Sequence, residues 1–207
     1  MFFVLFIKMN YKETTIDMYD YYAPGFNENT WRDLETLRWY MGDFLFKLKG
    51  FRVLDLGCGP GKCSEVIKKE GYVVTSFDLS KQMLKLCERR NSRRVLGDLE
   101  SMPFLDRKFD GILASTSLIH MPKSNLPNVL RDIKRCLKKN GVFYPIVKEG
   151  EGEGWEESDK YPGMERYIAY YKKEEFREYL EDSGFDITKT ITEKVGRATF
   201  LIYKCNF

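Results

Sequence analysis

Histidine and paired cysteines are the most informative shortages in this chain. The 207 residues contain one histidine, His120, and the five cysteines form no Cys-x-x-Cys pair. Metal sites built from several imidazoles or from paired thiolates are therefore excluded, and no metal ligand set is expected. An odd number of scattered cysteines does not make a disulfide framework, which favours a reducing compartment and a cytoplasmic location.

Long apolar runs are also lacking. The apolar start from Phe2 to Ile7 is far shorter than the roughly 20 residues that a helix needs to span a bilayer. It has neither the basic leader nor the small-residue cleavage site of a signal peptide. Either it packs on the domain or translation begins at Met9, and no membrane association is expected.

A charge excess of one sign is missing as well. The 34 Lys and Arg residues nearly balance the 31 Asp and Glu residues, leaving a formal charge of +3. This excess is too small to indicate a nucleic-acid partner. The apolar fraction of 43% is typical of a globular protein, and a chain of this length can bury a core without disulfides. The sequence does not indicate an oligomeric state.

Short apolar runs alternate with helical patterns through the middle of the chain. We predict strands over 51–56, 72–77, 95–96, 109–114 and 142–147. Helices are predicted over 62–70, over a segment capped by Ser80, and from Leu126 through Leu137 to an end at Asn140-Gly141. This alternation predicts a doubly wound α/β fold, with a mostly parallel sheet, helices on both faces and ligands at the carboxyl ends of the strands.

The flanking segments follow other patterns. Pro24-Gly25 is predicted to break the chain, and Thr30 to cap a helix that ends at Gly50. The glycine-rich, acidic stretch 148–162 is predicted to be a loop or lid over the strand ends. A helix ending at Gly184 precedes two runs, 185–192 and 198–205, that suit an antiparallel hairpin at the sheet edge.

A glycine-rich turn directly follows the first predicted strand. It reads Asp-x-Gly-x-Gly-x-Gly, from Asp55 through Gly57 and Gly59 to Gly61, with Cys58 between the first two glycines. Glycines let the backbone turn tightly and let a ligand approach the main chain. The N–H groups of the following helix favour an anionic group such as a carboxylate.

Two aspartates follow the next two predicted strands. Asp78 comes after the second strand, where a carboxylate can accept both hydroxyls of a ribose. Asp98 comes after the third strand and is placed to accept from an exocyclic amine. A dinucleotide fingerprint would need a glycine at Lys62, and a Walker loop would need Ser or Thr at Cys63, so both are disfavoured.

The order of these motifs resembles that of class I S-adenosylmethionine-dependent methyltransferases. Residues 53–61 look like their motif I, 77–80 like motif II and 97–99 like the adenine-contacting motif, while 109–120 and 137–142 resemble later blocks. The resemblance covers roughly residues 50–147 and implies a Rossmann-like seven-stranded sheet with the last strand antiparallel. Residues 147–154, 170–171 and Phe185 also look like a group of small bacterial-type methyltransferases of unassigned substrate.

The resemblance implies a cofactor, S-adenosylmethionine, and a product, S-adenosylhomocysteine. It also implies one domain over 1–207, with an N-terminal helical cap (1–49), a cofactor-binding core (50–147) and a lid loop, helix and C-terminal hairpin (148–207). The cofactor-binding residues would be Asp55, Gly57, Cys58, Gly59 and Gly61 at the methionine end, Asp78 at the ribose, Leu79, Met83, Asp98 and Leu99 at the adenine, Ser115 closing the methionine end, and Tyr19 as a cover.

The acceptor side is less defined by the sequence. The sulfonium already activates the methyl group, so the protein mainly aligns the acceptor and excludes water. His120 is the candidate general base, with packing against Met121-Pro122 as the alternative. Arg166, Tyr167, Tyr170 and Tyr171 could face the pocket or the surface. Glu149, Glu151 and Glu153 would suit a cationic acceptor at the pocket mouth, or form a solvated loop.

Some acceptors are disfavoured by missing motifs. The Asn/Asp-Pro-Pro-aromatic motif of enzymes that methylate amines in nucleic acids or proteins is absent after strand four, where 114–117 read Ala-Ser-Thr-Ser. No Pro-Cys nucleophile for pyrimidine carbon is present. We therefore expect a small-molecule acceptor. The alternatives are a non-catalytic cofactor-binding subunit that activates a partner, a methyltransferase acting on RNA or protein, and a nicotinamide-dependent oxidoreductase.

Overall fold

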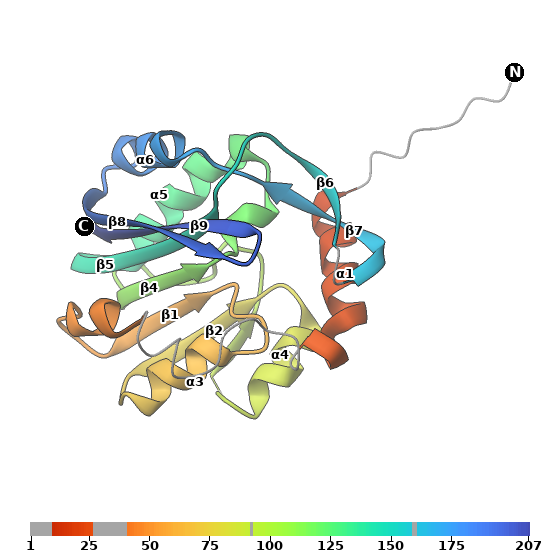
Figure 1. The fold of residues 1–207 in the computed structure, drawn as a ribbon. Helices are drawn as coiled ribbons and strands as arrows, with labels where there is room; N and C mark the ends of the chain where they lie inside the picture. Colours follow the sequence, from red (N-terminus) through yellow and green to blue (C-terminus); the bar gives the residue numbers. More distant parts are fainter. Residues whose placement is uncertain (1–9, 27–40, 92, 159–160) are drawn as a thin grey trace, which may run out of the picture.

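A seven-stranded sheet runs through the centre of the molecule (Figure 1). The computed structural model describes residues 10–26, 41–91, 93–158 and 161–207. The strand order is β3-β2-β1-β4-β5-β9-β8. Strands β1 to β5 are parallel, and β9 is antiparallel to both β5 and β8. The bounds are β1 Arg52–Leu56, β2 Val73–Asp78, β3 Arg94–Leu96, β4 Phe109–Ser115, β5 Leu137–Lys148, β8 Asp186–Val195 and β9 Ala198–Asn206. The predicted doubly wound sheet and its C-terminal hairpin are confirmed.

Helices cover both faces of this sheet, as Figure 1 shows. The bounds are α3 Lys62–Lys69, α4 Lys81–Glu88, α5 Leu126–Cys136 and α6 Lys173–Asp182. Ser80 caps α4 as predicted, because its side chain accepts a hydrogen bond from Met83 N. Residues 41–46 are helical and contribute to the core on the face that α3 covers.

Successive side chains of a strand point to opposite faces of the sheet, and this builds two hydrophobic cores. In β1, Val53 packs with the α3 side chains Val66 and Ile67, whereas Leu54 packs with Leu130 of α5 on the other face. The period of two follows from the pleat of a strand. The first parallel strand lies between β2 and β4, so the direction of winding reverses beside β1, where doubly wound folds bind ligands.

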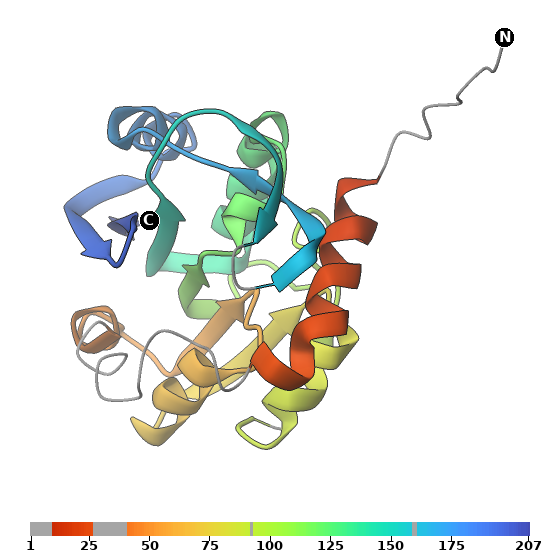
Figure 2. The ribbon, with the colours of Figure 1, turned by 45° about the vertical axis from the view of Figure 1, so that its right-hand side comes forward.

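A second layer of structure closes the carboxyl end of the sheet. Helix α1, Tyr11–Phe26, contacts both α4 and β7, and Figure 2 shows it running beside the two-stranded sheet of β6, Glu153–Ser158, and β7, Tyr161–Ala169. The predicted break at Pro24-Gly25 is wrong, because Pro24 lies inside the last turn of α1. The remaining predictions on residues 1–9 and 27–40, including Thr30, lie outside the described residues.

The acidic stretch 148–162 was predicted as a loop or lid, and the loop alternative is wrong over much of its length. Residues Glu153–Ser158 form β6, which pairs with β7 in an antiparallel register that sets Glu156 opposite Arg166. Opposite charges directly across an antiparallel pair stabilise it. The strand therefore forms through its partner rather than through apolar side chains of its own.

The predicted end of the helix after β4 is also wrong. Helix α5 ends at Cys136, and Leu137 already pairs with Phe109 in the sheet. Asn140 has a φ of 62°, in the left-handed region, and lies where the register between β4 and β5 shifts. The Asn-Gly signal that was assigned to a helix end therefore belongs to an irregularity inside β5.

No helix in the described ranges has the length and apolar content that crossing a bilayer requires.

Candidate active site

The loop after β1 is fastened to the end of β2. Gly57 N and Cys58 N both donate to Phe77 O, at 2.8 and 3.0 Å, and Gly59 N donates to Asp78 Oδ2 at 2.8 Å. Gly57 has a φ of 71°, and a Cβ on it would clash with Ser117, which follows β4. Glycine is required here because the turn passes so close to the neighbouring strand end.

The other two loop glycines have different surroundings. Gly59 has a φ of 52°, and a Cβ on it would meet no atom within 4 Å. Gly61 has a φ of 82° and caps α3, and a Cβ there would overlap Cys87 Sγ on α4. Gly59 thus faces open space, whereas Gly61 allows close packing of the loop against a helix.

Asp78 is a buried carboxylate held by the backbone. Its Oδ2 accepts from Gly59 N, and its Oδ1 accepts from Ser80 N at 2.9 Å. Burial raises the pKa of Asp78, although these backbone hydrogen bonds oppose the rise. Each carboxylate oxygen can accept more than one hydrogen bond, so acceptor capacity remains for a ligand.

Asp98 and Asp55 stand at two other strand ends. Asp98 Oδ1 accepts from Glu100 N at 2.9 Å, and its Oδ2 pairs with Lys12 Nζ of α1 at 2.6 Å. Asp55 is 1% exposed and accepts from Ser64 Oγ of α3 at 2.6 Å. Burial raises the pKa of Asp55 to about 6.

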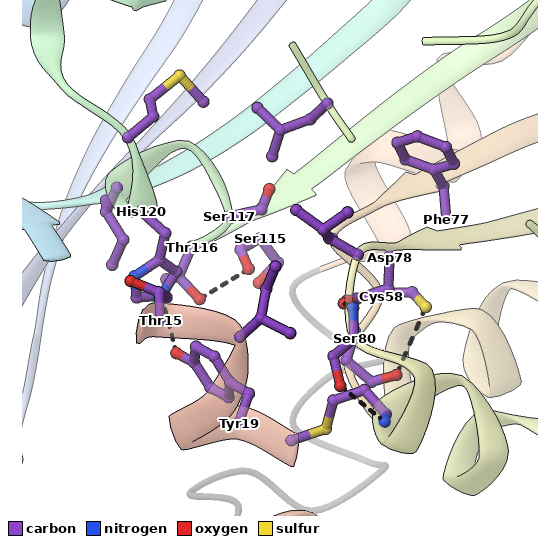
Figure 3. Close-up of a pocket in the computed structure, with 18 of the residues that line it drawn as sticks. Thr15, Tyr19, Cys58, Phe77, Asp78, Ser80, Ser115, Thr116, Ser117 and His120 are labelled. Atoms are coloured by element: carbon purple, nitrogen blue, oxygen red, sulfur yellow. Dashed lines mark hydrogen bonds between the residues drawn. The ribbon is translucent and has the colours of Figure 1, made fainter. Parts of the chain in front are cut away.

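The hydroxyl of Tyr19 points toward His120, as Figure 3 shows. His120 Nδ1 lies 2.9 Å from Tyr167 O, and its Nε2 lies 2.8 Å from Tyr19 OH. Because a carbonyl only accepts, Nδ1 carries the hydrogen and Nε2 accepts from the Tyr19 hydroxyl. Burial, helped by the charge of Arg166, lowers the pKa of His120 to about 4, so the ring is neutral at pH 7.

Arg166 of β7 completes this group. Its Nη1 donates to Tyr19 OH at 3.3 Å. Burial raises the pKa of Tyr19, so the hydroxyl keeps its proton. Tyr19 therefore links α1, β7 and the segment after β4 through one oxygen atom.

Asp55, Asp78, Asp98, Tyr19, His120 and Arg166 line one cavity of about 420 Å³ at the carboxyl ends of the five parallel strands. In Figure 3, Cys58, Asp78 and Ser80 lie across it from Tyr19 and His120. Every site residue predicted from the sequence lines it except Gly61. The other lining side chains include Lys12, Thr15, Ile16, Lys148, Arg166, Ile168 and Phe200.

Glu149, Glu151 and Glu153, for which both a pocket-mouth and a solvated position were considered, do not line this cavity. Glu151 pairs with Lys172 at 2.8 Å on the surface, and Glu153 accepts from Lys123 N at 2.6 Å. Of the four lid residues considered, Arg166 lines the cavity and Tyr167, Tyr170 and Tyr171 do not. Within the ranges that the structure describes, no group of His, Cys, Asp and Glu could hold a metal ion.

Of the side chains that α1 contributes, the sequence predicted Tyr19, whereas Lys12, Thr15 and Ile16 were missed. Lys12, Thr15, Ile16 and Tyr19 all line the cavity, and their spacing of three and four places them on one helical face. That spacing was a usable signal for a helix. It was overlooked because Pro24-Gly25 was interpreted as a break in the chain. Lys148 was also missed, although it closes β5 at the same edge as the other strand ends.

Known proteins share this sequence pattern. Residues 54–144 match the sequence model of a family described as a methyltransferase domain. The malonyl-(acyl-carrier protein) O-methyltransferase of Hamiltonella defensa subsp. Acyrthosiphon pisum is 30% identical over 57% of this chain and 48% of its own length. The demethylmenaquinone methyltransferase of Thermotoga maritima is 30% identical over 48% of this chain and 44% of its own length. The chain thus spans about half the length of the curated relatives it matches.

A solved structure has the same fold. The 1,6-didemethyltoxoflavin-N1-methyltransferase of Burkholderia thailandensis, solved with 1,6-didemethyltoxoflavin and S-adenosylhomocysteine bound, superposes with a TM-score of 0.72. The superposition covers 94% of this chain and 88% of that one at 19% identity, which shows the fold alone. Residues 54–144, which include the glycine loop, Asp78 and Asp98, therefore match a methyltransferase domain, and the chain has the fold of class I S-adenosylmethionine-dependent methyltransferases.

Proposed function

We propose that this protein is an enzyme that transfers a methyl group from S-adenosylmethionine to a small molecule. One observation carries the proposal. A single cavity joins the glycine loop, Asp78 and Asp98 to a second group of side chains around Tyr19 and His120. The first group suits a nucleoside cofactor, and the second leaves room for an acceptor beside it.

The residues present fit the cofactor. Gly59 leaves open space beside the main chain where a ligand can approach. The Asp78 carboxylate keeps acceptor capacity for the two ribose hydroxyls, and Leu79, Met83 and Leu99 supply apolar surface for a purine. The cavity volume of about 420 Å³ is within the usual range for sites that bind small molecules.

The two parts of the chain have separate roles in this proposal. Bound S-adenosylmethionine would supply a methyl group on a positively charged sulfur. Residues 50–147 bind the cofactor, while α1 and β7 close the acceptor side and exclude water. Neutral His120 takes any proton that the acceptor loses, passed through the hydroxyl of Tyr19. Its pKa of about 4 makes it a weak base, which favours acceptors with an acidic proton.

The alternatives are less favoured. The Thermotoga relative is named for demethylmenaquinone, a small molecule, which supports a small acceptor over RNA or protein. A non-catalytic subunit would not need the partly buried, hydrogen-bonded pair of Tyr19 and His120. All five cysteines are free, which supports a reducing compartment, and we place the protein in the cytoplasm.

A labelling experiment tests the proposal. The protein is incubated with S-adenosylmethionine carrying a tritiated methyl group, and with small-molecule extracts, total RNA or total protein from several microorganisms. Label is expected in the small-molecule fraction, and Asp78→Ala should greatly reduce it. Label only in RNA or protein would contradict a small acceptor. Bound cofactor with no labelled product in any fraction would contradict catalysis.

Substitutions of Gly59 and Gly61 give a matched pair of variants. Gly59→Ala adds a methyl group in the cavity and is expected to weaken cofactor binding by about 10-fold or more, with a stability cost of roughly 1–2 kcal/mol from the left-handed backbone. Gly61→Ala bears the same backbone cost plus an overlap with Cys87, so it is expected to destabilise the fold by roughly 1–3 kcal/mol more.

Calorimetric titration and urea unfolding of both variants measure the two effects. Gly61→Ala, in the fraction that remains folded, should bind the cofactor with nearly the wild-type affinity. The reverse result, with normal binding by Gly59→Ala and lost binding by folded Gly61→Ala, would show that the cofactor lies elsewhere along the loop.

A further inference from the structure

Two cationic side chains line the acceptor side of the cavity. Lys148 stands at the end of β5 and Arg166 on β7, and both line the cavity beside the Tyr19–His120 pair. Their side chains are only 22% and 17% exposed. Their positive charges both act on His120 and help to lower its pKa. This end of the cavity therefore has a positive potential.

Most of the hydrogen-bonding capacity of Arg166 is unused by the chain. A guanidinium has five N–H donors. Arg166 Nη1 reaches Tyr19 OH at 3.3 Å, and Nη2 is 3.8 Å from Glu156 Oε1, beyond hydrogen-bond distance. Its Nε is buried and has no hydrogen-bond partner among the described residues. This atom is enclosed by the chain, so the donors that remain for a ligand in the cavity are those on Nη1 and Nη2.

One carboxylate faces both cations and holds neither closely. Lys148 Nζ and Arg166 Nη2 each lie 3.8 Å from the same atom, Glu156 Oε1, so the two charges are neighbours. Glu156 itself accepts a hydrogen bond from Tyr170 OH, which in turn accepts from Lys148 at 3.0 Å. At 3.8 Å Glu156 makes no hydrogen bond with the guanidinium of Arg166, and no other carboxylate among the described residues pairs with Arg166.

The other acids that line the cavity lie at the cofactor end. Asp55 is bonded to Ser64, Asp78 to backbone amides, and Asp98 together with Glu100 to Lys12. Lys12 and Lys62 also line the cavity at this end, but the four acids outnumber these two cations. The cavity thus has acids at its cofactor end and cations at its acceptor end, which is the polarity that attracts an anionic acceptor.

We propose that the acceptor is an organic acid whose carboxylate is anchored between Arg166 and Lys148. This inference rests on the methyl-transfer function proposed above. Ile16, Ile168 and Phe200 line the same cavity and provide apolar surface for the body of such a molecule. A carboxylate paired with two cations has its lone pairs engaged and is a poor nucleophile, so it holds the acceptor while another atom receives the methyl group.

Matched acids and amides test this anchor. Benzoate, phenylacetate and 3-phenylpropanoate, each beside its own amide, are titrated by calorimetry into the protein with and without S-adenosylhomocysteine. At least one acid is expected to bind about 10- to 100-fold more tightly than its amide, the range of hydrogen bonds to a charged group. Arg166→Gln and Lys148→Gln should each reduce that preference by about 10-fold or more.

Arg177→Gln serves as the matched control, because Arg177 pairs with Glu174 and Glu181 on α6 and does not line the cavity. It should keep the full preference for the acid. Thermal melting checks that Arg166→Gln is folded, and Arg166→Lys, which keeps the charge, should retain part of the preference.

The possible failures are distinguishable. Equal affinity for every acid and its amide, or no binding of either, would overturn the anchor. So would a full preference for the acid in folded Arg166→Gln. A wild-type protein that prefers the acid but does not bind S-adenosylhomocysteine would contradict the methyl-transfer function and leave the anion site standing.

Discussion

Replacing Asp78 by alanine is expected to weaken the binding of S-adenosylmethionine by about 1.5–3 kcal/mol, or roughly 10- to 150-fold in Kd. The carboxylate is buried at the end of β2 and keeps acceptor capacity beyond the two backbone amides that it already holds. Ribose hydroxyls would donate to it, and hydrogen bonds to a charged acceptor are the stronger kind. Isothermal titration calorimetry measures the loss directly.

Two further variants separate this loss from a general disturbance of the loop. Asp78→Asn keeps an acceptor oxygen and should lose less affinity than Asp78→Ala. Glu88→Ala removes a carboxylate on α4 that is 63% exposed and pairs with Arg94, and it should bind the cofactor as the wild type does. An unchanged affinity in folded Asp78→Ala would remove this carboxylate from the site.

The cofactor half of the site could be predicted because its signals are local. Asp55 and Asp78 lie in the last two residues of β1 and β2, Asp98 lies just beyond β3, and the carboxyl ends of neighbouring parallel strands meet at one edge of a sheet. The place of each aspartate along the sequence was therefore enough to predict that the three lie at the same edge of the sheet. Gly61 shows the limit of this reasoning, because it was predicted to bind the cofactor, whereas it does not line the cavity and packs against Cys87 on α4.

The acceptor half depends on contacts between distant parts of the chain. Tyr19 meets His120 across 101 residues and Arg166 across 147. Neither contact can be predicted from the periodic pattern of apolar residues within one segment. The acidic stretch was misjudged for the same reason, since β6 is stabilised by its pairing with β7, and the carboxylates considered for the pocket mouth turn elsewhere. The polarity of the acceptor end, which depends on Lys148 and Arg166, follows only from packing.

The stability of the protein is expected to depend on pH through Asp55 and His120 with opposite signs. Burial raises the pKa of Asp55 from 3.8 to about 6, so the folded state binds more protons between these values and the contribution of Asp55 falls as pH rises. Burial lowers the pKa of His120 from 6.5 to about 4. The folded state then binds fewer protons, and the contribution of His120 rises with pH. Each of these two contributions to the unfolding free energy changes by roughly 3 kcal/mol over its pH range.

Urea unfolding of Asp55→Asn and His120→Asn between about pH 4 and pH 7 separates the two contributions. Relative to the wild type, the unfolding free energy of Asp55→Asn should rise by roughly 3 kcal/mol up to about pH 6, and that of His120→Asn should fall by a similar amount up to about pH 6.5. The double variant should show a nearly flat difference, since the two slopes cancel when the sites act independently. A substitution cost that does not depend on pH shifts the whole plot of variant minus wild-type unfolding free energy against pH and leaves its slope unchanged. If the plots for Asp55→Asn and His120→Asn had the same slope, the burial of one of these groups would be contradicted.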